Sequence, residues 1–255
     1  MVRGLYSAYT GMLNQQHMLD TITNNLANSA TTGYKKEGST AKAFDEMFAI
    51  KVHDGSEDYI DKRIGKVSLG VKIGENYTDY TQGNLKGTEN PYDLAIAGTG
   101  FFEISYTNKA DEQSMKYTRD GSFTVTREGY LVTKDGDFVQ GQNGNIQLST
   151  KVDAVIDDMG HIYQNNTLVD TIKIVDFEDY NYLKKFGENM YDGVEGIQQK
   201  EGDYLIQQGY LEASNANVIS EMVEMITITR AFEMNQKFVQ AADETLEKDV
   251  NLATS

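Results

Sequence analysis

The chain has 255 residues, of which 39% are hydrophobic and 24% charged, and its 39 acidic and 23 basic side chains give a formal net charge of −16. This length allows one large domain or two ordinary ones, and the acidic balance argues against a nucleic-acid binder, which needs a basic surface over the phosphates. The absence of cysteine excludes disulfides, thiolate zinc sites and cysteine nucleophiles, and leaves the redox compartment open.

The sequence predicts neither a membrane span nor a cleavable signal peptide. Charged residues interrupt every apolar stretch well before the ~20 residues that a bilayer requires. The first residues, MVRGLYSAYTGMLNQQHMLD, mix Tyr, Asn and Gln through the part that a signal peptide keeps apolar. If the protein leaves the cytoplasm, we expect it to do so without the ordinary secretory signal.

Residues 1–33 are predicted to form an N-terminal assembly helix, running over about residues 3–30. Its apolar residues recur at seven-residue spacing, in Leu5, Met12, Leu19 and Leu26. Ile22 widens this stripe, which is the pattern of a helix that packs against a partner helix. Gly33 follows two β-branched threonines and is expected to end the helix.

Residues 34–90 are rich in glycine and charge, with weak alternation over residues 66–72. We predict an extended arm or linker that is partly β.

Residues 91–205 are predicted to form a central antiparallel β domain, because the apolar period changes from seven to two. The alternating positions include Tyr92, Leu94, Ile96, Phe102, Ile104, Tyr106, Phe123, Val125, Ile172 and Ile174. Turn pairs lie between them, namely Asp120-Gly121, Glu128-Gly129, Asp135-Gly136, Asn143-Gly144 and Met159-Gly160. Such pairs between alternating runs are typical of β-hairpins.

Residues 206–255 are predicted to form a C-terminal assembly helix of about 30 residues, or roughly 45 Å. The seven-residue repeat returns in Val218, Met225, Phe232, Val239 and Leu246, and Met222 widens it. Ser214 with Asn215 is the expected N-cap. The fold class is therefore α+β, with long N- and C-terminal helices in a coiled-coil-like domain and a central antiparallel β domain.

Residues with catalytic or ligand-binding chemistry are not arranged as such sites require. His17, His53 and His161 lie in three different segments, and Gly98-Thr99-Gly100 is followed by Glu103 where a dinucleotide-binding motif needs glycine. Asp135-Gly136-Asp137 resembles a fragment of a calcium loop, but hairpin turns use the same residues. We predict no catalytic, cofactor-binding or metal-binding residues.

The terminal helices favour a role in assembly over the alternative of two core helices packed on the sheet. Asn and Gln flank the N-terminal stripe, and their amides suit interfaces between subunits better than a dry core. The candidate assembly residues are Leu5, Met12, Leu19, Ile22, Asn24, Asn25, Leu26, Asn28, Val218, Met222, Met225, Phe232, Val239 and Leu246.

The N-terminal GLYSAYTGML and LDTITNNLANSATTGYKK closely resemble the signature of bacterial flagellar rod and hook axial proteins. The family's Asn-Asn-Leu-Ala-Asn core corresponds to residues 24–28, and its Thr-Gly-Tyr/Phe-Lys element to residues 32–35. Residues 90–104 (NPYDLAIAGTGFFEI) and residues 117–141 are similar to the family's β-domain motifs. The end, from QGYLEASNANVISEMVEMITITRAFEMNQKF onward, is similar to its C-terminal helix.

The resemblance implies a non-enzymatic structural subunit of the flagellar basal-body rod, proximal or distal. It implies that the terminal helices polymerise helically as an inner tube around the export channel, with the β domain outside, and transmit torque. The expected partners are further copies, other rod and hook axial proteins and the flagellar type III export apparatus, without nucleic acid or a membrane span. The expected location is the basal body in the cell envelope. The alternatives are a secreted carbohydrate-active or calcium-binding β protein with helical termini, and an adhesin-like binding module.

Overall fold

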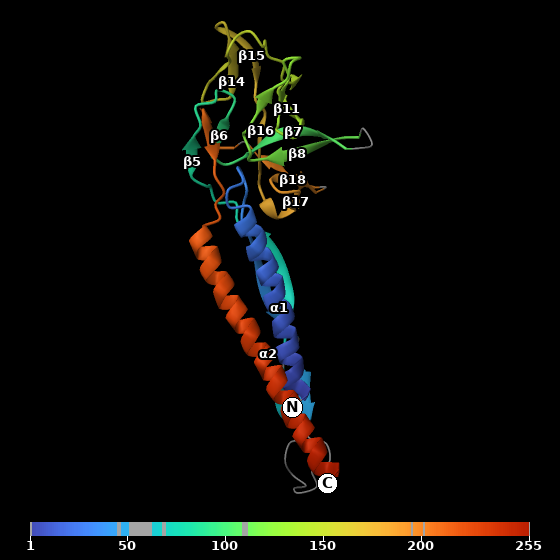
Figure 1. Cartoon of the computed structure of the whole chain (residues 1–255). Coiled ribbons are helices and arrows are strands. Elements are labelled where there is room, and N and C mark those ends of the chain that lie inside the picture. The colour runs from blue at the N-terminus through green and yellow to red at the C-terminus, as the bar shows by residue number, and fades with distance from the viewer. Residues whose placement is uncertain are drawn as a thin grey trace. The chain divides into compact units, whose positions relative to one another are not determined.

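A computed structural model describes residues 2–44, 47–50, 63–67, 70–108, 112–194, 196–200 and 202–254 (Figure 1). The chain forms two compact units, and each is built from separate stretches of sequence. Unit 1 contains Met1–Leu26, Glu37–Thr78 and Val218–Ser255, whereas unit 2 contains Ala27–Lys36 and Asp79–Asn217. His53 lies outside the described residues.

Unit 1 combines two long helices with β-hairpins. Its elements are α1 (Val2–Ala27), β1 (Glu37–Ala43), β2 (Met47–Ile50), β3 (Arg63–Val67), β4 (Val71–Thr78) and α2 (Val218–Thr254). β1 pairs antiparallel with β4, with an irregularity between Ser39 and Ala41, and β2 pairs antiparallel with β3.

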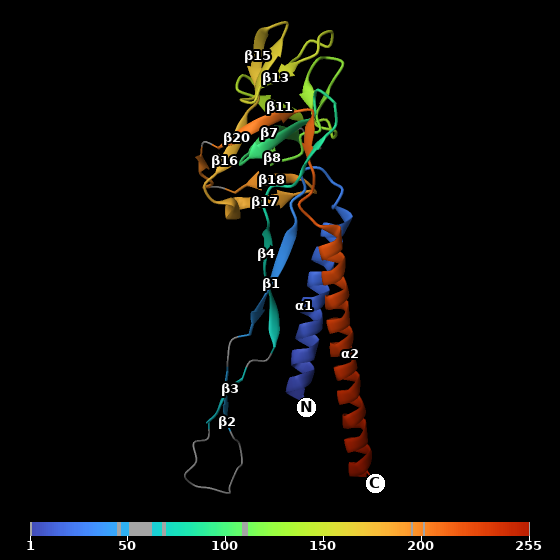
Figure 2. The same ribbon diagram turned by 90° about the vertical axis from the view of Figure 1, so that its left-hand side faces the viewer.

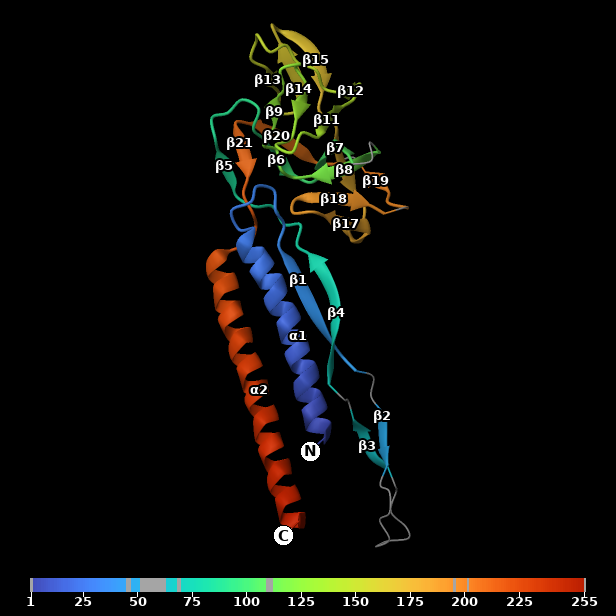
Figure 3. The same ribbon diagram turned by 45° about the vertical axis from the view of Figure 1, so that its right-hand side comes forward.

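Helix α1 lies along the β1–β4 strand pair, which is visible beside it in Figure 3. The Val71 amide donates a hydrogen bond of 3.3 Å to the Thr10 hydroxyl, and the His17 ring is hydrogen-bonded to the Asn76 amide side chain at 2.9 Å. Residue numbers rise together along α1 and β4 in these two contacts, so the helix and the strand are parallel. The arm predicted as partly β therefore includes a strand pair that follows the first helix.

The C-terminal helix begins later and runs longer than predicted. Tyr210–Glu212 is a strand, β21, and α2 spans 37 residues from Val218. Asn215 is not an N-cap, because its side chain accepts a hydrogen bond from the Lys36 amide and donates to the Asp79 carbonyl. The Ser214 hydroxyl accepts from the Ala216 amide, ahead of the helix. Tertiary hydrogen bonds thus hold this segment outside the helix.

Unit 2 is an assembly of antiparallel strands, as predicted for the middle of the chain. Its elements are β5 (Leu85–Gly87), β6 (Leu94–Gly98), β7 (Phe101–Thr107), β8 (Gln113–Thr118), β9 (Thr124–Val125), β10 (Leu131–Val132), β11 (Phe138–Gly141), β12 (Gly144–Asn145), β13 (Val155–Ile156), β14 (His161–Gln164), β15 (Thr167–Thr171), β16 (Ile174–Phe177), the 3₁₀ turn η1 (Tyr180–Tyr182), β17 (Leu183–Phe186), β18 (Met190–Gly193), β19 (Gln199–Lys200), β20 (Tyr204–Gln208) and β21 (Tyr210–Glu212).

The largest sheet of unit 2 has ten strands, with the order β17-β18-β8-β7-β11-β10-β9 along its main path. Its strands β17, β18, β8 and β7 are labelled in Figure 2. β12 joins it at β11, and β16 joins at β7 and carries β19. A three-stranded sheet has the order β13-β14-β15, and two further pairs join β20 to β6 and β21 to β5. The α+β class is confirmed.

Two hydrophobic clusters form the core of unit 2, and β7 contributes to both. Phe102 and Ile104 enter the first cluster together with Leu94, Ile96 and other buried residues of the central strands. Phe101, which faces the other way along the strand, enters the second cluster. That second cluster consists of Phe101, Tyr117, Val175, Phe177, Leu183 and Tyr191, with Tyr80, Tyr180 and Ile197 packed against it.

Four of the five predicted turn pairs lie at hairpin turns, where Gly129, Gly136, Gly144 and Gly160 adopt positive φ. Asp120-Gly121 is not a hairpin turn, because β8 and β9 do not pair in the sheet. Gly121 instead lies against the Leu94 carbonyl, where a Cβ would collide. This glycine is required by close backbone approach rather than by a turn.

Candidate assembly surface and buried ion cluster

Helices α1 and α2 pack side by side and antiparallel within unit 1. Asn235 donates a hydrogen bond of 3.1 Å from its amide to Gln15, and Asn25 donates one of 3.2 Å to the Glu221 carboxylate. Residue numbers therefore fall along α2 as they rise along α1. Near the start of α1, Gly4 faces the Phe238 ring, and a Cβ there would lie 3.2 Å from it. The absence of a side chain at this position lets the α2 ring approach the α1 backbone.

The register of this pairing leaves the end of α2 beyond α1. Since Gly4 lies opposite Phe238 and α1 begins at Val2, the start of α1 falls at about residue 240 of α2. Residues 242–254 extend past it, a projection of about 13 residues or roughly 20 Å. Four acidic residues and one lysine lie in this projection, at Asp243, Glu244, Glu247, Asp249 and Lys248.

Asn25 joins three elements of unit 1. It is only 2% exposed. Its side chain accepts a hydrogen bond of 2.9 Å from the Glu37 amide and donates one of 2.8 Å to the Glu37 carbonyl, in addition to the bond to Glu221. Glu221, also buried, lies in the first turn of α2, where a negative charge is favoured by the helix dipole. Asn25 thus links the end of α1, the start of β1 and the start of α2.

The predicted assembly residues differ in their exposure. Ile22 and Asn25 are buried within this chain. Those that are half-buried are Leu5, Met12, Leu19, Leu26, Asn28, Met225, Phe232, Val239 and Leu246. Those that are exposed are Asn24, Val218 and Met222. The structure brings Asn25 to α2, and contact of this set with another subunit stays a prediction.

Exposed apolar side chains also occur on the outer sides of both helices. We call Tyr6, Tyr9 and Leu13, at 61%, 55% and 43% exposure, the α1 apolar face. Met222, Val223 and Ile226, at 50%, 60% and 54%, form the α2 apolar face. Of these six residues, only Met222 belongs to the predicted assembly set. The spacing of these residues is nevertheless typical of a helix face: Tyr6, Tyr9 and Leu13 lie at i, i+3 and i+7, and Met222 and Ile226 lie at i and i+4.

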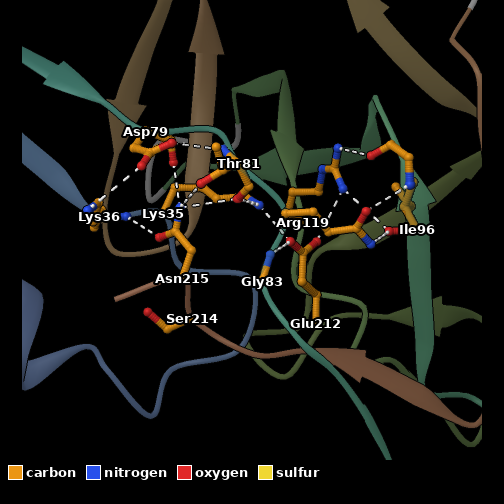
Figure 4. A network of polar contacts seen from close by, with 12 residues as sticks. Lys35, Lys36, Asp79, Thr81, Gly83, Ile96, Arg119, Glu212, Ser214 and Asn215 are labelled. Carbon is orange, nitrogen blue, oxygen red and sulfur yellow. Dashed lines mark hydrogen bonds and ion pairs between the residues drawn. The ribbon is translucent and has the colours of Figure 1, made fainter. Parts of the chain in front are cut away.

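Unit 2 contains a buried ion cluster, formed by Lys35, Arg119 and Glu212 and called here the Glu212 cluster (Figure 4). The Glu212 carboxylate lies 2.6 Å from the Lys35 ammonium and 3.2 Å from the Arg119 guanidinium. The exposed fraction of the side chain is 0% for Glu212, 1% for Lys35 and 5% for Arg119. Burial lowers the pKa of Lys35, and the adjacent Glu212 carboxylate opposes this shift.

Backbone groups complete the environment of the Glu212 cluster. Glu212 accepts a hydrogen bond of 2.8 Å from the Gly83 amide. Lys35 donates to the Thr81 carbonyl at 2.8 Å, and Arg119 donates to the Gly98 carbonyl at 2.8 Å. The cluster therefore holds together five separate stretches of unit 2. No spacing pattern in the sequence predicts this cluster, and of its three residues only Lys35 belongs to the N-terminal family motif.

The described residues carry no group of three or more His, Asp or Glu side chains placed to hold a metal ion. His17 is bound to Asn76, and His161 lies 3.9 Å from Asp157. Among the described helices, none is long and apolar enough to cross a membrane.

Three family profiles match successive parts of the chain. Residues 5–35 match the flagella basal body rod protein family, residues 95–164 the D1 domain of flagellar hook protein FlgE/F/G, and residues 207–252 the C-terminal region of flagellar basal body rod FlgEFG proteins. The chain is 33% identical over 262 residues to flagellar basal-body rod protein FlgG of Agrobacterium fabrum, covering 95% of this chain and 96% of that protein. It is 32% identical over 276 residues to FlgG of Bacillus subtilis, covering 99% of each. The chain belongs to the flagellar basal-body rod protein family.

Membership in the rod family confirms the resemblance and gives the chain its role as a structural subunit of the basal-body rod, located in the flagellar basal body. A further relative, the flagellar hook-basal body complex protein FlhO of Bacillus subtilis, is 28% identical and covers 98% of each chain. The family is consistent with a protein that is not an enzyme, and it supports association with other flagellar axial proteins. The carbohydrate-active, calcium-binding and adhesin-like alternatives give way to this assignment.

Proposed function

We propose that this rod subunit polymerises helically through its terminal helices around the export channel, and that the resulting tube transmits torque. The observation that carries the proposal is the exposure of two different apolar faces on the paired helices of unit 1. A fully buried aliphatic side chain contributes about 1.5–3 kcal/mol, so each half-exposed residue of the α2 apolar face could add about 1 kcal/mol in an interface.

The two faces differ in chemistry, which supports an open-ended assembly. The α1 apolar face combines two tyrosines, with their hydroxyls, and one leucine, whereas the α2 apolar face is aliphatic and contains methionine. An interface between unlike surfaces is heterologous, and it continues as a helix when its rotation does not close a ring. The half-buried seven-residue stripes would then hold the two helices of one subunit, or of neighbours, in a coiled-coil-like inner tube.

We assign each part of the chain its own role in this assembly. The helices Val2–Ala27 and Val218–Thr254 serve assembly, the strand pairs of unit 1 between them form the arm, and unit 2 is the β domain. The proposed partners are further copies, other rod and hook proteins and the type III export apparatus. The terminal segments gain their full order on incorporation, because neighbouring subunits then cover apolar surface that the monomer leaves exposed.

The test is a charge on the α2 apolar face. Val223→Asp and Ile226→Asp place a carboxylate where a neighbour should bury the side chain, but where the monomer exposes it. We expect soluble, folded monomers, non-motile cells and incomplete rods by electron microscopy of isolated basal bodies. Thr150→Asp, which places the same charge at an exposed turn of unit 2, is the control and should leave motility intact. Normal rods with both Asp variants would contradict assembly through this face.

A further inference from the structure

Residues 204–215, called here the closing segment, complete unit 2 by pairing with strands from much earlier in the chain. β20 pairs with β6 along its whole length, and β21 pairs with β5. Ile206 of β20 is 1% exposed and enters the first hydrophobic cluster with Leu94 and Ile96. Without this segment, β5 and β6 lose their strand partners, and the first cluster is open on one side.

Polar side chains of the closing segment also bind distant parts of unit 2. Gln208 accepts a hydrogen bond of 3.2 Å from the Ile156 amide and donates to the carbonyls of Pro91 and Ala154 at 2.8 and 2.9 Å. Asn215 accepts from the Lys36 amide at 2.7 Å and donates to the Asp79 carbonyl at 2.8 Å. These two side chains therefore satisfy five backbone groups in four separate parts of unit 2.

Glu212 adds the negative charge that the two buried cations of unit 2, Lys35 and Arg119, require. Its partners Lys35, Arg119 and Gly83 lie 177, 93 and 129 residues away in the sequence. Until Glu212 arrives, a dry site would contain two cations without their carboxylate, which is strongly unfavourable in a low-dielectric interior. The surroundings of Lys35 and Arg119 must consequently stay hydrated while the closing segment is absent.

Much of the remaining sheet depends on nearer neighbours. β7 pairs with β8, β10 with β11, β14 with β15 and β17 with β18, each with the next strand along the chain. A longer connection, from Thr118 in β8 to Asn189 beside β18, spans 71 residues. Local pairings form before distant ones because closing a long loop costs entropy that only later contacts offset.

We propose that the closing segment joins last, and that Glu212 acts as a positioning residue whose charge permits unit 2 to close. The β7–β8 and β17–β18 hairpins form first, and β5, β6, β20 and β21 become ordered together in a later step that Glu212 controls. Unit 2 thus stays open until the closing segment has joined it.

The experiment refolds the full-length protein from urea and labels its amides with short deuterium pulses. We expect protection in β7, β8, β17 and β18 first, and simultaneous later protection in β5, β6, β20 and β21. Glu212→Gln should slow the later phase at least tenfold and leave the early phase unchanged. In the native state it should speed amide exchange in β5 and β6 at least 100-fold. Glu128→Gln, at an exposed turn, is the matched control and should change neither phase.

A second variant keeps the test decisive if Glu212→Gln does not fold. Gln208→Ala removes three hydrogen bonds of the closing segment without leaving a buried charge, and it should also slow the later phase alone. Protection of β6 and β20 at the same rate as β7 and β8 would overturn the proposal. Slowing of the early hairpins by either variant would overturn it as well, because the segment would then belong to the first step.

Discussion

Replacing Asn25 with alanine should loosen the junction of α1, β1 and α2 while leaving both helices intact. The change removes two hydrogen bonds to the Glu37 backbone and one to the buried Glu221 carboxylate. Neutral hydrogen bonds contribute about 1 kcal/mol each, and one to a charged group about 1.5–3 kcal/mol. The better helix propensity of alanine returns about 0.5 kcal/mol. The net loss for local opening is therefore about 3–4.5 kcal/mol.

Native-state amide exchange on the full-length protein measures this loss. At 1.4 kcal/mol per factor of ten, amides in the last turns of α1 and the first residues of β1 should exchange at least 100-fold faster in Asn25→Ala. Asn24→Ala is the matched control, because Asn24 is the adjacent residue and is exposed. Its effect should stay within about 0.5 kcal/mol. Equal effects of the two substitutions, or a change below threefold for Asn25→Ala, would refute the role assigned to this junction.

Two further predictions concern unit 2. Gly33→Ala should lower its melting temperature by several degrees, since Gly33 has φ of +68° and a Cβ there would collide with the backbone of Arg119 and Asp120; an unchanged melting curve would contradict this. Burial, together with the hydrogen bond from its hydroxyl to Asp176, raises the pKa of Tyr180 from 10.0 to about 12. The raised pKa in the folded state means that this stabilisation is fully present below pH 10 and is lost as the pH rises towards 12. The urea midpoint should thus fall less steeply over this range in Tyr180→Phe than in the unmodified protein, and parallel curves would count against the assignment.

The elements that the sequence predicts are those whose conformation depends on residues close together in the chain. The seven-residue repeats identify both helices, and the glycines at 129, 136, 144 and 160 mark hairpin turns, because positive φ favours glycine directly. Gly121 has the same sequence appearance, but its cause is the Leu94 carbonyl, which approaches from another strand. Residue type alone does not separate these two uses of glycine.

The features that escaped prediction depend on distant partners. Asn215 has the sequence context of an N-cap, yet its hydrogen bonds to Lys36 and Asp79 hold it ahead of the helix. Glu212 is one of 39 acidic residues, and nothing within its own segment distinguishes it from an exposed glutamate. Only the fold brings Lys35 and Arg119 to it. The α1 and α2 apolar faces form a second stripe on each helix, on a side that the seven-residue repeat does not include.

The unequal lengths of the paired helices have a mechanical consequence. In the proposed helical rod, the part of α2 that extends roughly 20 Å past α1 would lie alongside a neighbouring subunit. The overlap between the two subunits would run along the helix axis. A bending or twisting load would then pass between subunits as shear along the overlap, spread over several helical turns. The acidic side chains of residues 243–249 would lie in this overlap, so its strength should depend on ionic strength.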